Sequence, residues 1–442
     1  MGHSLDYKIT RLGLPILIGQ LGTIVVGFAD TAMVGHHSTA ELASASFVNN
    51  LFNVAIFTLL GFSYGLTPIV GALFGAGKRS DIGATMRNAI VANLGFGLLV
   101  GAIMLAVYFN LGRLGQPVEL LPLIRPYYLI YLSGIVPLAL FNAFAQWAYA
   151  INRTRMPMWI ILISNVLNIA GNYAFIYGRW GMPEMGLNGA GVSTLLARVF
   201  CAVAIIVIFC TRRDYGIYRA GLKSGKLTGR SLKEITFTSV PVSLQMGFES
   251  GSFTAAAVMA GWLGALDLAA YQVTVILGTL GFCIYYSMGA ATSIMVANAS
   301  GVNDRKLMRR TAYAGYRIIL TLATISSLIF FFLARPILTV FTSDPAVISL
   351  SLTLIFPLIL YQLGDATQIT FANALRGTSK VMPMMWISLI SYVVIGMPAT
   401  YILAFPCEMG LYGIILSFSV SLFIAGALFL YFFQRATRKT QE

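Results

Sequence analysis

Apolar runs of about 20 residues recur along this 442-residue chain, with short polar segments between them. As a helix, each run is long enough to cross a hydrocarbon core of roughly 30 Å. Hydrophobic residues make up 58% of the chain and charged residues only 10%, whereas a soluble domain carries about 25% charged residues. A large soluble core would not produce so regular a rhythm. The sequence therefore predicts an all-α integral membrane protein.

We predict twelve transmembrane helices, each centred on one apolar run. Their expected ranges are 15–35, 49–74, 88–109, 125–150, 157–177, 187–210, 236–257, 268–297, 312–333, 347–374, 383–404 and 411–433.

The basic residues predict the orientation of these helices. With a cytoplasmic N-terminus, most of the 29 lysines and arginines fall in cytoplasmic segments, and the external segments hold only Arg113, Arg179 and Arg335. This bias follows the positive-inside rule and predicts an even number of spans with both termini in the cytoplasm. It also accounts for the net charge of +14, since basic loops meet anionic lipid. We therefore expect membrane lipid as a partner, and no nucleic acid.

Cysteine and histidine provide no recognisable catalytic or metal-binding pattern. The four cysteines have neither disulfide-framework nor metal-ligand spacing. His36 and His37 are adjacent, and neighbouring rings do not easily reach one metal ion. No nucleotide-binding motif is complete. The sequence thus predicts a protein that is not an enzyme and has no metal site or cofactor.

The chain contains two copies of one unit. The segment Glu184–Gly189 recurs as Glu408–Gly413, with an offset of 224, before the last helix of each half. Repeated matches at nearly one offset indicate duplication. We predict two six-helix bundles, 1–210 and 235–442, joined by a basic cytoplasmic linker, 211–234. Because six crossings preserve orientation, a pseudo-twofold axis along the membrane normal is expected to relate the bundles.

Three of the fifteen acidic residues fall inside predicted spans: Asp30, Glu249 and Asp365. A carboxylate in the membrane costs at least about 2.5–3.5 kcal/mol, so a cation, a proton or a basic partner must offset it. The alternative to a transport role is a structural ion pair. Arg198 is the one clearly mid-span basic residue and could neutralise one acid, not three.

Polar side chains accompany these acids at helical spacing. Such stripes also form ordinary helix–helix hydrogen bonds, which stays an open alternative for each stripe alone. When the two halves are aligned with an offset of 226, the positions that correspond to these acids in the other half are not acidic. We therefore expect a distinct ionisable site in each half. The stripes are Gln245, Glu249 and Ser252; Tyr361, Asp365 and Gln368; and Asn165, Asn168 and Asn172.

Taken together, these features resemble the multidrug and toxic compound extrusion (MATE) family, over nearly the whole chain. The similarity lies in twelve spans, paired halves, Pro15 with Gln20 and Asp30, and the glycine-rich start of the sixth helix. Glu249 and Asp365, in Gln245–Ser250 and Gln362–Ala366, resemble the acids of the NorM-like branch. The resemblance implies antiport of cationic amphipathic compounds, such as drugs or dyes, against Na⁺ or H⁺.

The same resemblance implies roles for neighbouring side chains. Asn168, Asn172 and Thr194 look like companions of Asp30 in a cation site of the first half. Tyr361 looks like a companion of Asp365, and Gln245 and Gln368 would support the second-half acids. Some relatives carry a further acid where this chain has Asn172, which lowers the charge of the first site.

Two other functions compete with drug efflux. A flippase for lipid-linked saccharides would need basic residues within the spans to hold a polyanionic headgroup, and Arg198 alone is clearly placed there. A membrane receptor or scaffold would not need intramembrane acids. We expect a monomeric multidrug exporter in a bacterial inner membrane.

Overall fold

The computed structural model describes residues 4–114 and 117–438, and its regular elements within these ranges are all helices. The chain divides into two compact units. The first unit is Ile18–Ser243. The second unit combines Met1–Leu17 with Leu244–Glu442.

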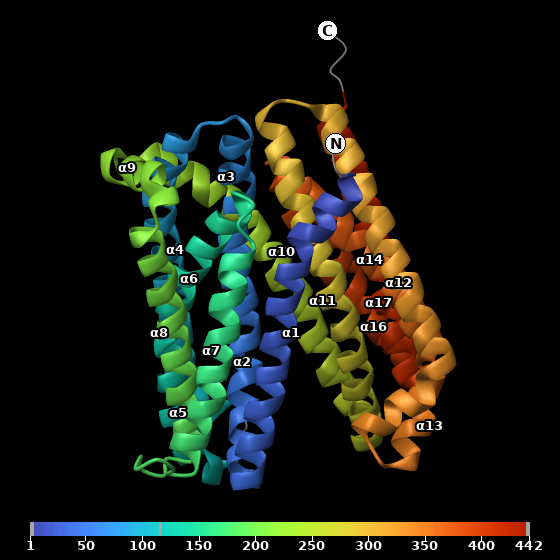
Figure 1. Ribbon diagram of the computed structural model, residues 1–442. Helices are drawn as coiled ribbons and strands as arrows, with labels where there is room; N and C mark the ends of the chain where they lie inside the picture. Colours follow the sequence, from blue (N-terminus) through green and yellow to red (C-terminus); the bar gives the residue numbers. More distant parts are fainter. Residues whose placement is uncertain (1–3, 115–116, 439–442) are drawn as a thin grey trace. The chain divides into compact units, whose positions relative to one another are not determined.

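The first unit holds most of α1, all of α2 to α9 and the start of α10 (Figure 1). Its elements are α1 (Leu5–His37), α2 (Thr39–Tyr64), α3 (Leu66–Gly75), α4 (Arg79–Phe109), η1 (Leu111–Arg113), η2 (Val118–Leu120), α5 (Leu121–Ser133), α6 (Ile135–Ala150), α7 (Arg155–Ile176), α8 (Leu187–Thr211), η3 (Arg213–Tyr215), α9 (Gly216–Ser224) and α10 (Gly229–Leu263).

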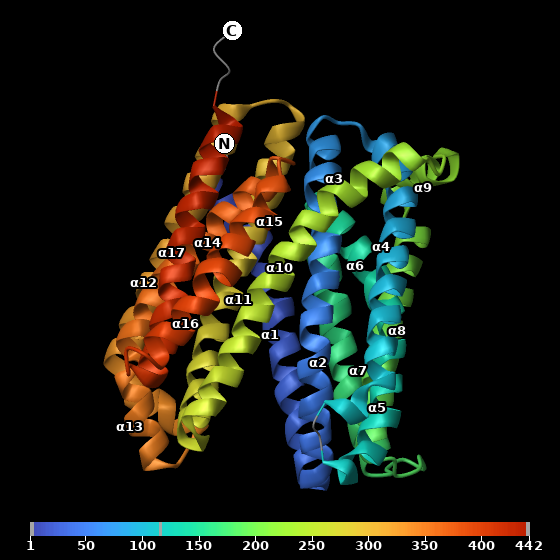
Figure 2. The same ribbon diagram turned by 180° about the vertical axis from the view of Figure 1, so that it is seen from behind.

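The second unit holds the start of α1, the rest of α10 and the following helices (Figure 2). These are α11 (Ala265–Gly301), α12 (Arg305–Phe341), α13 (Pro345–Thr353), α14 (Ile355–Gly377), α15 (Met382–Ser388), the π-helix η4 (Leu389–Gly396), α16 (Met397–Ala404) and α17 (Gly410–Thr437).

Among the described residues, ten helices are long and apolar enough to cross a membrane. An eleventh span results if α13 and α14, bent by 53° at their junction, count as one. The remaining predicted span, 236–257, lies inside α10, which is 35 residues long. α10 carries buried polar side chains, including Ser243, Gln245 and Ser252, and is not among those ten helices.

The two units differ from the predicted bundles because the first helix contributes to both. Ile9 is fully buried and packs with Ala291 of α11 and Ala314 of α12. A side chain on Gly13 would lie 2.8 Å from the sulfur of Met288, so α1 and α11 are in close contact. Residues before 18 therefore belong with the second unit.

The predicted linker, 211–234, is folded against the first unit. A Cβ atom on Gly83 of α4 would lie 2.1 Å from the carbonyl oxygen of Tyr218, so only glycine allows α9 to pack this closely. Trp147 of α6 is fully buried, and its ring meets Tyr215 and Tyr218 edge to face at 5.0 and 5.5 Å. The first part of this segment is thus a packed helix.

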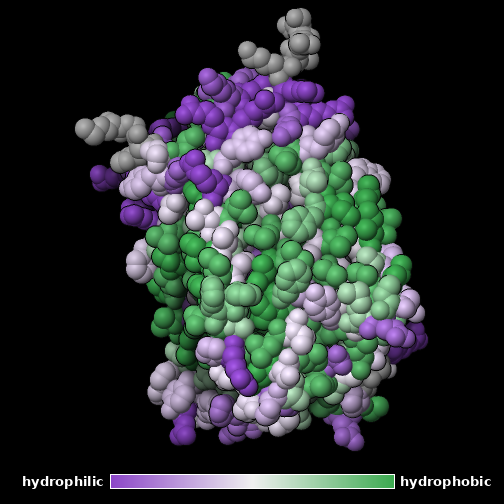
Figure 3. Space-filling model, turned by 90° about the vertical axis from the view of Figure 1, so that its right-hand side faces the viewer, coloured by the Kyte–Doolittle hydropathy of each residue, from purple (hydrophilic) through white to green (hydrophobic). Residues whose placement is uncertain are grey.

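Apolar side chains cover the middle of the face shown in Figure 3, and hydrophilic side chains gather toward its two ends. On α12 the exposed side chains include Leu328, Phe331 and Phe332. Long helices with exposed apolar side chains along their middle suit a lipid environment. The protein is a multi-pass membrane protein.

The internal repeat has matching backbone geometry in the two units. Gly186 and Gly410 have φ angles of 53° and 54°, in the left-handed region that glycine tolerates best. Added Cβ atoms on Gly189 and Gly413 would lie 2.5 and 2.7 Å from carbonyl oxygens of the preceding helix. The repeated glycines therefore start α8 and α17 in the same way.

This packing predicts a stability effect. We expect Gly189→Ala to destabilise the protein by about 1–3 kcal/mol, because the added methyl group must displace the backbone of Phe175. A lower melting temperature of the purified protein would report this loss. Gly101→Ala on α4, where a Cβ has nothing within 4 Å, is the control, and equal melting of the two variants would contradict the prediction.

Candidate functional site

In the first unit, Asp30 of α1 begins a chain of polar side chains that continues through α7 to α8. Asn172 Nδ2 donates to Asp30 Oδ1 and lies 3.3 Å from Asn168 Oδ1. Asn168 Nδ2 in turn donates to Thr194 Oγ1 at 3.3 Å. The four predicted side chains of the first half are therefore connected in one network.

Small residues hold this network in place. Ser193 Oγ of α8 donates to the carbonyl oxygen of Asn168 at 2.7 Å, and a Cβ on Gly171 would lie 2.5 Å from that same Oγ. Asn172 is fully buried, and its Oδ1 has no hydrogen-bond partner among the described residues. Carboxylate, amide and hydroxyl oxygens thus lie in one network, in which the Oδ1 atom of Asn172 is free to accept a further bond. Such oxygens are suitable ligands for a hard cation.

In the second unit, Glu249 of α10 and Asp365 of α14 lie within electrostatic range of each other. Gln245 Nε2 donates to Glu249 Oε2 at 3.0 Å. Asp365 is 1% exposed, and its Oδ2 has no hydrogen-bond partner in the described part of the chain. Gln368 is also buried, with its Oε1 unpaired there. Among the described residues, Gln368 makes no hydrogen bond to either acid.

Aromatic rings line the region around these acids. Phe253, Tyr361 and Phe418 come from α10, α14 and α17, and their ring centroids lie 4.6 to 6.4 Å apart. Tyr392 of η4 is buried, and both carboxylates act on its hydroxyl group. Faces of aromatic rings attract organic cations. Sequence analysis identified Tyr361 but missed the other three rings.

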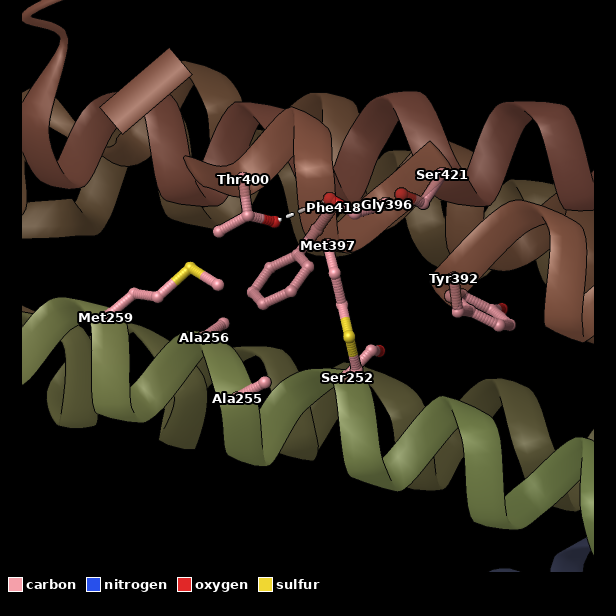
Figure 4. A pocket seen from close by; sticks show the side chains of 10 residues that line it. All are labelled: Ser252, Ala255, Ala256, Met259, Tyr392, Gly396, Met397, Thr400, Phe418 and Ser421. Carbon is pink, nitrogen blue, oxygen red and sulfur yellow. Dashed lines mark hydrogen bonds between the residues drawn. The ribbon is translucent and has the colours of Figure 1, made fainter. Parts of the chain in front are cut away.

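A pocket in the second unit lies beside this acidic site (Figure 4). Ser252, whose hydroxyl donates to the carbonyl oxygen of Glu249 at 2.8 Å, connects the two. Hydroxyl groups, methionine sulfurs and aromatic rings give the pocket a mixed polar and apolar lining. The lining residues are Ser252, Ala255, Ala256, Met259, Tyr392, Gly396, Met397, Thr400, Phe418 and Ser421.

The π-helix η4 forms one wall of this pocket. Pro398 follows it and cannot donate a backbone hydrogen bond to Val394, which disturbs the regular α-helical pattern. Thr400 Oγ1 donates to the carbonyl oxygen of Gly396 at 2.9 Å, one turn earlier, and contacts Ser417 Oγ of α17 at 2.7 Å. A Cβ on Gly396 would lie 2.7 Å from Ser421 Oγ, so glycine lets α17 approach. Such π-helical turns occur frequently at functional sites.

The membrane acids have no close basic partner. Within residues 4–114 and 117–438, the ion pairs are His37–Glu41, His37–Glu184 and Arg317–Asp6. Arg198 instead lies over the ring of Tyr131, 4.4 Å from its centroid. These contacts argue against the alternative that structural ion pairs neutralise the three acids.

One basic residue lies deeper than expected. The topology prediction placed Arg376 in a cytoplasmic loop, but α14 continues to Gly377 and Arg376 is only 4% exposed. Gly377 packs against α11, since its Cβ would lie 2.7 Å from the carbonyl oxygen of Ser293. Arg376 Nη1 donates to Asn373 Oδ1 at 3.1 Å, and its charge acts on Glu249 from a distance.

The sequence matches the model of the MatE family twice, over residues 15–174 and 241–402. Two such matches, one to each half, together cover more than half of the chain. The chain belongs to the MatE family of MATE transporters.

Curated relatives match this chain over nearly their whole length and share a name. The chain is 28% identical to "Probable multidrug resistance protein NorM" of Neisseria meningitidis, over 98% of this chain and 94% of the relative. It is 30% identical to the protein of the same name from Geobacillus kaustophilus, over 98% and 96% of the two chains. The protein is therefore a NorM-like member of the family.

Solved structures show the same fold. The eukaryotic MATE transporter AtDTX14 superposes with a TM-score of 0.88 at 17% identity, covering 98% of this chain and 97% of that one. A MOP superfamily transporter from Pyrococcus furiosus gives 0.89 at 18% identity, covering 99% and 98%. These similarities confirm the predicted all-α membrane fold.

Proposed function

We propose that this protein exports cationic amphipathic small molecules by antiport against H⁺ or Na⁺. The observation that carries the proposal is a pair of acidic sites, one in each unit, without a close basic partner. The aromatic rings beside Glu249 and Asp365 suit lipophilic cations. The relatives' name, multidrug resistance protein NorM, supports the same function.

In this proposal, Asp30 binds the coupling ion in the first unit with help from Asn168, Asn172 and Thr194. Glu249 and Asp365 form the second ion-binding site. Each carboxylate must take up a proton or a Na⁺ in at least one state, because burial disfavours an unpaired charge. Uptake would change the hydrogen bonds that hold the helices and so couple ion entry to drug release. No organic cofactor is required.

The setting that we propose is the inner membrane of a bacterium, with both termini in the cytoplasm. The bias of basic residues toward one side supports this orientation. Anionic lipid would contact the basic loops, and one chain holds both proposed sites, so a monomer would suffice for transport.

The proposal predicts drug resistance in living cells. Bacteria that lack their own efflux pumps are expected to accumulate less ethidium when they express this chain, because the acidic sites would carry the dye out. Measuring dye fluorescence after loading, with membrane expression confirmed by immunoblot, tests this. Unchanged accumulation at full expression would contradict the proposal.

Vesicles with imposed gradients would identify the ion. Purified protein in liposomes should move dye against its concentration gradient when a pH gradient, a Na⁺ gradient or both are imposed, and uphill transport without either gradient would exclude antiport. A lipid-linked saccharide replaces the dye in a parallel assay, so that flippase activity is measured directly.

A further inference from the structure

A group of three ionisable side chains lies at one end of the first unit, beyond the apolar part of α1. His37 ends α1, Glu41 lies in the first turn of α2, and Glu184 belongs to the connection between α7 and α8 (Figure 1). His37 Nδ1 is 2.6 Å from Glu41 Oε2, and its Nε2 is 3.1 Å from Glu184 Oε1. One imidazole therefore bridges carboxylates on two other segments.

Hydrogen-bond chemistry shows which form of His37 fits this geometry. A neutral imidazole has one N–H donor, so one carboxylate would face a nitrogen lone pair. The protonated ring donates from both nitrogens and places one positive charge between two negative ones. In the part of the chain that the structure describes, Glu41 and Glu184 are the charged side chains that act on this ring, and the Tyr177 ring lies 6.1 Å away.

Gly186 packs directly against His37 and Glu41. A Cβ at this position would lie 2.3 Å from Glu41 Oε1 and 3.0 Å from His37 Cε1. The backbone of Gly186 also has a φ of 53°, which a side chain would strain. The bridge therefore depends on a glycine that lets the connection approach both side chains.

The internal repeat shows that histidine is the special element here. At the repeat offsets, Glu41 corresponds to Asp267 and Glu184 to Glu408, whereas His37 corresponds to Leu263. The second half thus keeps both acids without an imidazole between them. The acids belong to the repeated scaffold, and the titratable bridge is found in the first half alone.

We propose that His37, Glu41 and Glu184 form a proton-binding site, separate from the membrane acids, that fixes the end of α1 when a proton is bound. Asp30 lies about two turns earlier on the same face of α1 and is bonded to Asn172 of α7. The protonated bridge attaches the same helix to the α7–α8 connection at a second point. When the proton is lost, His37 keeps only one of its two hydrogen bonds to the carboxylates. This end of α1 is then held less firmly.

The direction of the pH dependence follows from the contacts. The hydrogen bond to Glu184, together with that to Glu41, raises the pKa of His37 above its usual value. A raised pKa means that the bridge stabilises the fold at low pH and that this contribution disappears as pH rises through the pKa of the folded state. We therefore expect the bridge to contribute fully below the ordinary histidine pKa of 6.5 and to be lost at higher pH.

Hydrogen exchange of the purified protein, measured by mass spectrometry from pH 5.5 to 8, tests this proposal. After correction for the chemical exchange rate, protection of the segment 178–186 should fall by about tenfold as pH rises, the size expected for one charge-assisted bond. His37→Gln should remove this pH dependence. His36→Gln, at a ring whose hydrogen bond among the described residues goes to the carbonyl oxygen of Ala32, should leave it unchanged.

The equivalent segment of the second half, 402–410, is the internal control and should show no such step. Glu184→Gln provides a second variant if His37→Gln fails to fold, and it should weaken the step. A step that persists in His37→Gln, or a wild-type protein without a step, would overturn the proposal. The measurement needs no substrate or gradient, so its outcome is independent of whether the protein exports drugs.

Discussion

Glu249→Gln and Asp365→Asn are each expected to reduce gradient-driven efflux to the level of protein-free vesicles. Asp365 is buried and Glu249 half-buried in the second unit, and an amide can neither release a proton nor contribute a negative charge to a bound Na⁺. Because the amides are nearly isosteric and neutral, the fold should tolerate them. Dye efflux from liposomes under an imposed gradient measures the effect.

Glu234→Gln is the matched control for this experiment, since Glu234 lies on the same helix, α10, but is exposed near its start. It should transport as the wild-type protein does. If Glu249→Gln and Asp365→Asn also transport at the wild-type rate, both acids are structural and the proposed second ion site is wrong.

Asp30→Asn is expected to stop turnover while substrate binding continues. Asparagine resembles the protonated carboxyl group and can keep a hydrogen bond with Asn172, so the polar network of the first unit should persist. The variant would then remain in the state that follows ion uptake. Steady-state efflux should fall to background, whereas equilibrium dye binding should stay close to that of the wild type.

The exposed residue Asp214 of η3 provides the same chemical change outside the network, so Asp214→Asn should retain efflux. Normal steady-state efflux by Asp30→Asn would remove Asp30 from the mechanism. Loss of both binding and efflux, with a lower melting temperature, would instead indicate a folding defect.

The sequence predicted the helical spans well because length and apolarity are local properties. It could not predict that α14 begins with a bend after Leu354, or that α14 continues to Gly377, because these depend on packing against other helices. The π-helix η4 was missed for the same reason: the hydroxyl of Thr400, just after it, contacts Ser417 Oγ of α17 at 2.7 Å, and a contact between two helices cannot be read from the sequence.

The candidate site could be predicted from the sequence where a residue type is rare in its surroundings. A carboxylate in an apolar span is conspicuous, and spacing by one turn identified Gln245 beside Glu249. Tyr392 and Phe418 were missed because aromatic residues are common in spans, and only the fold shows that they face the acids. His37 was considered only as a metal ligand. Its contacts with the carboxylates of Glu41 and of Glu184, which lies far away in the sequence, were therefore not predicted.

The contact of the first residues with the second unit has a consequence for biosynthesis. Ile9 and Gly13 are made long before their partners Met288 and Ala291, which lie on α11, a helix that begins at Ala265. At about 5–20 residues per second, the ribosome takes on the order of tens of seconds to reach them. During that time the start of α1 must remain in the nascent chain without its final neighbours. Completion of the second unit therefore has to wait for late translation, even though one of its segments leaves the ribosome before the first unit does.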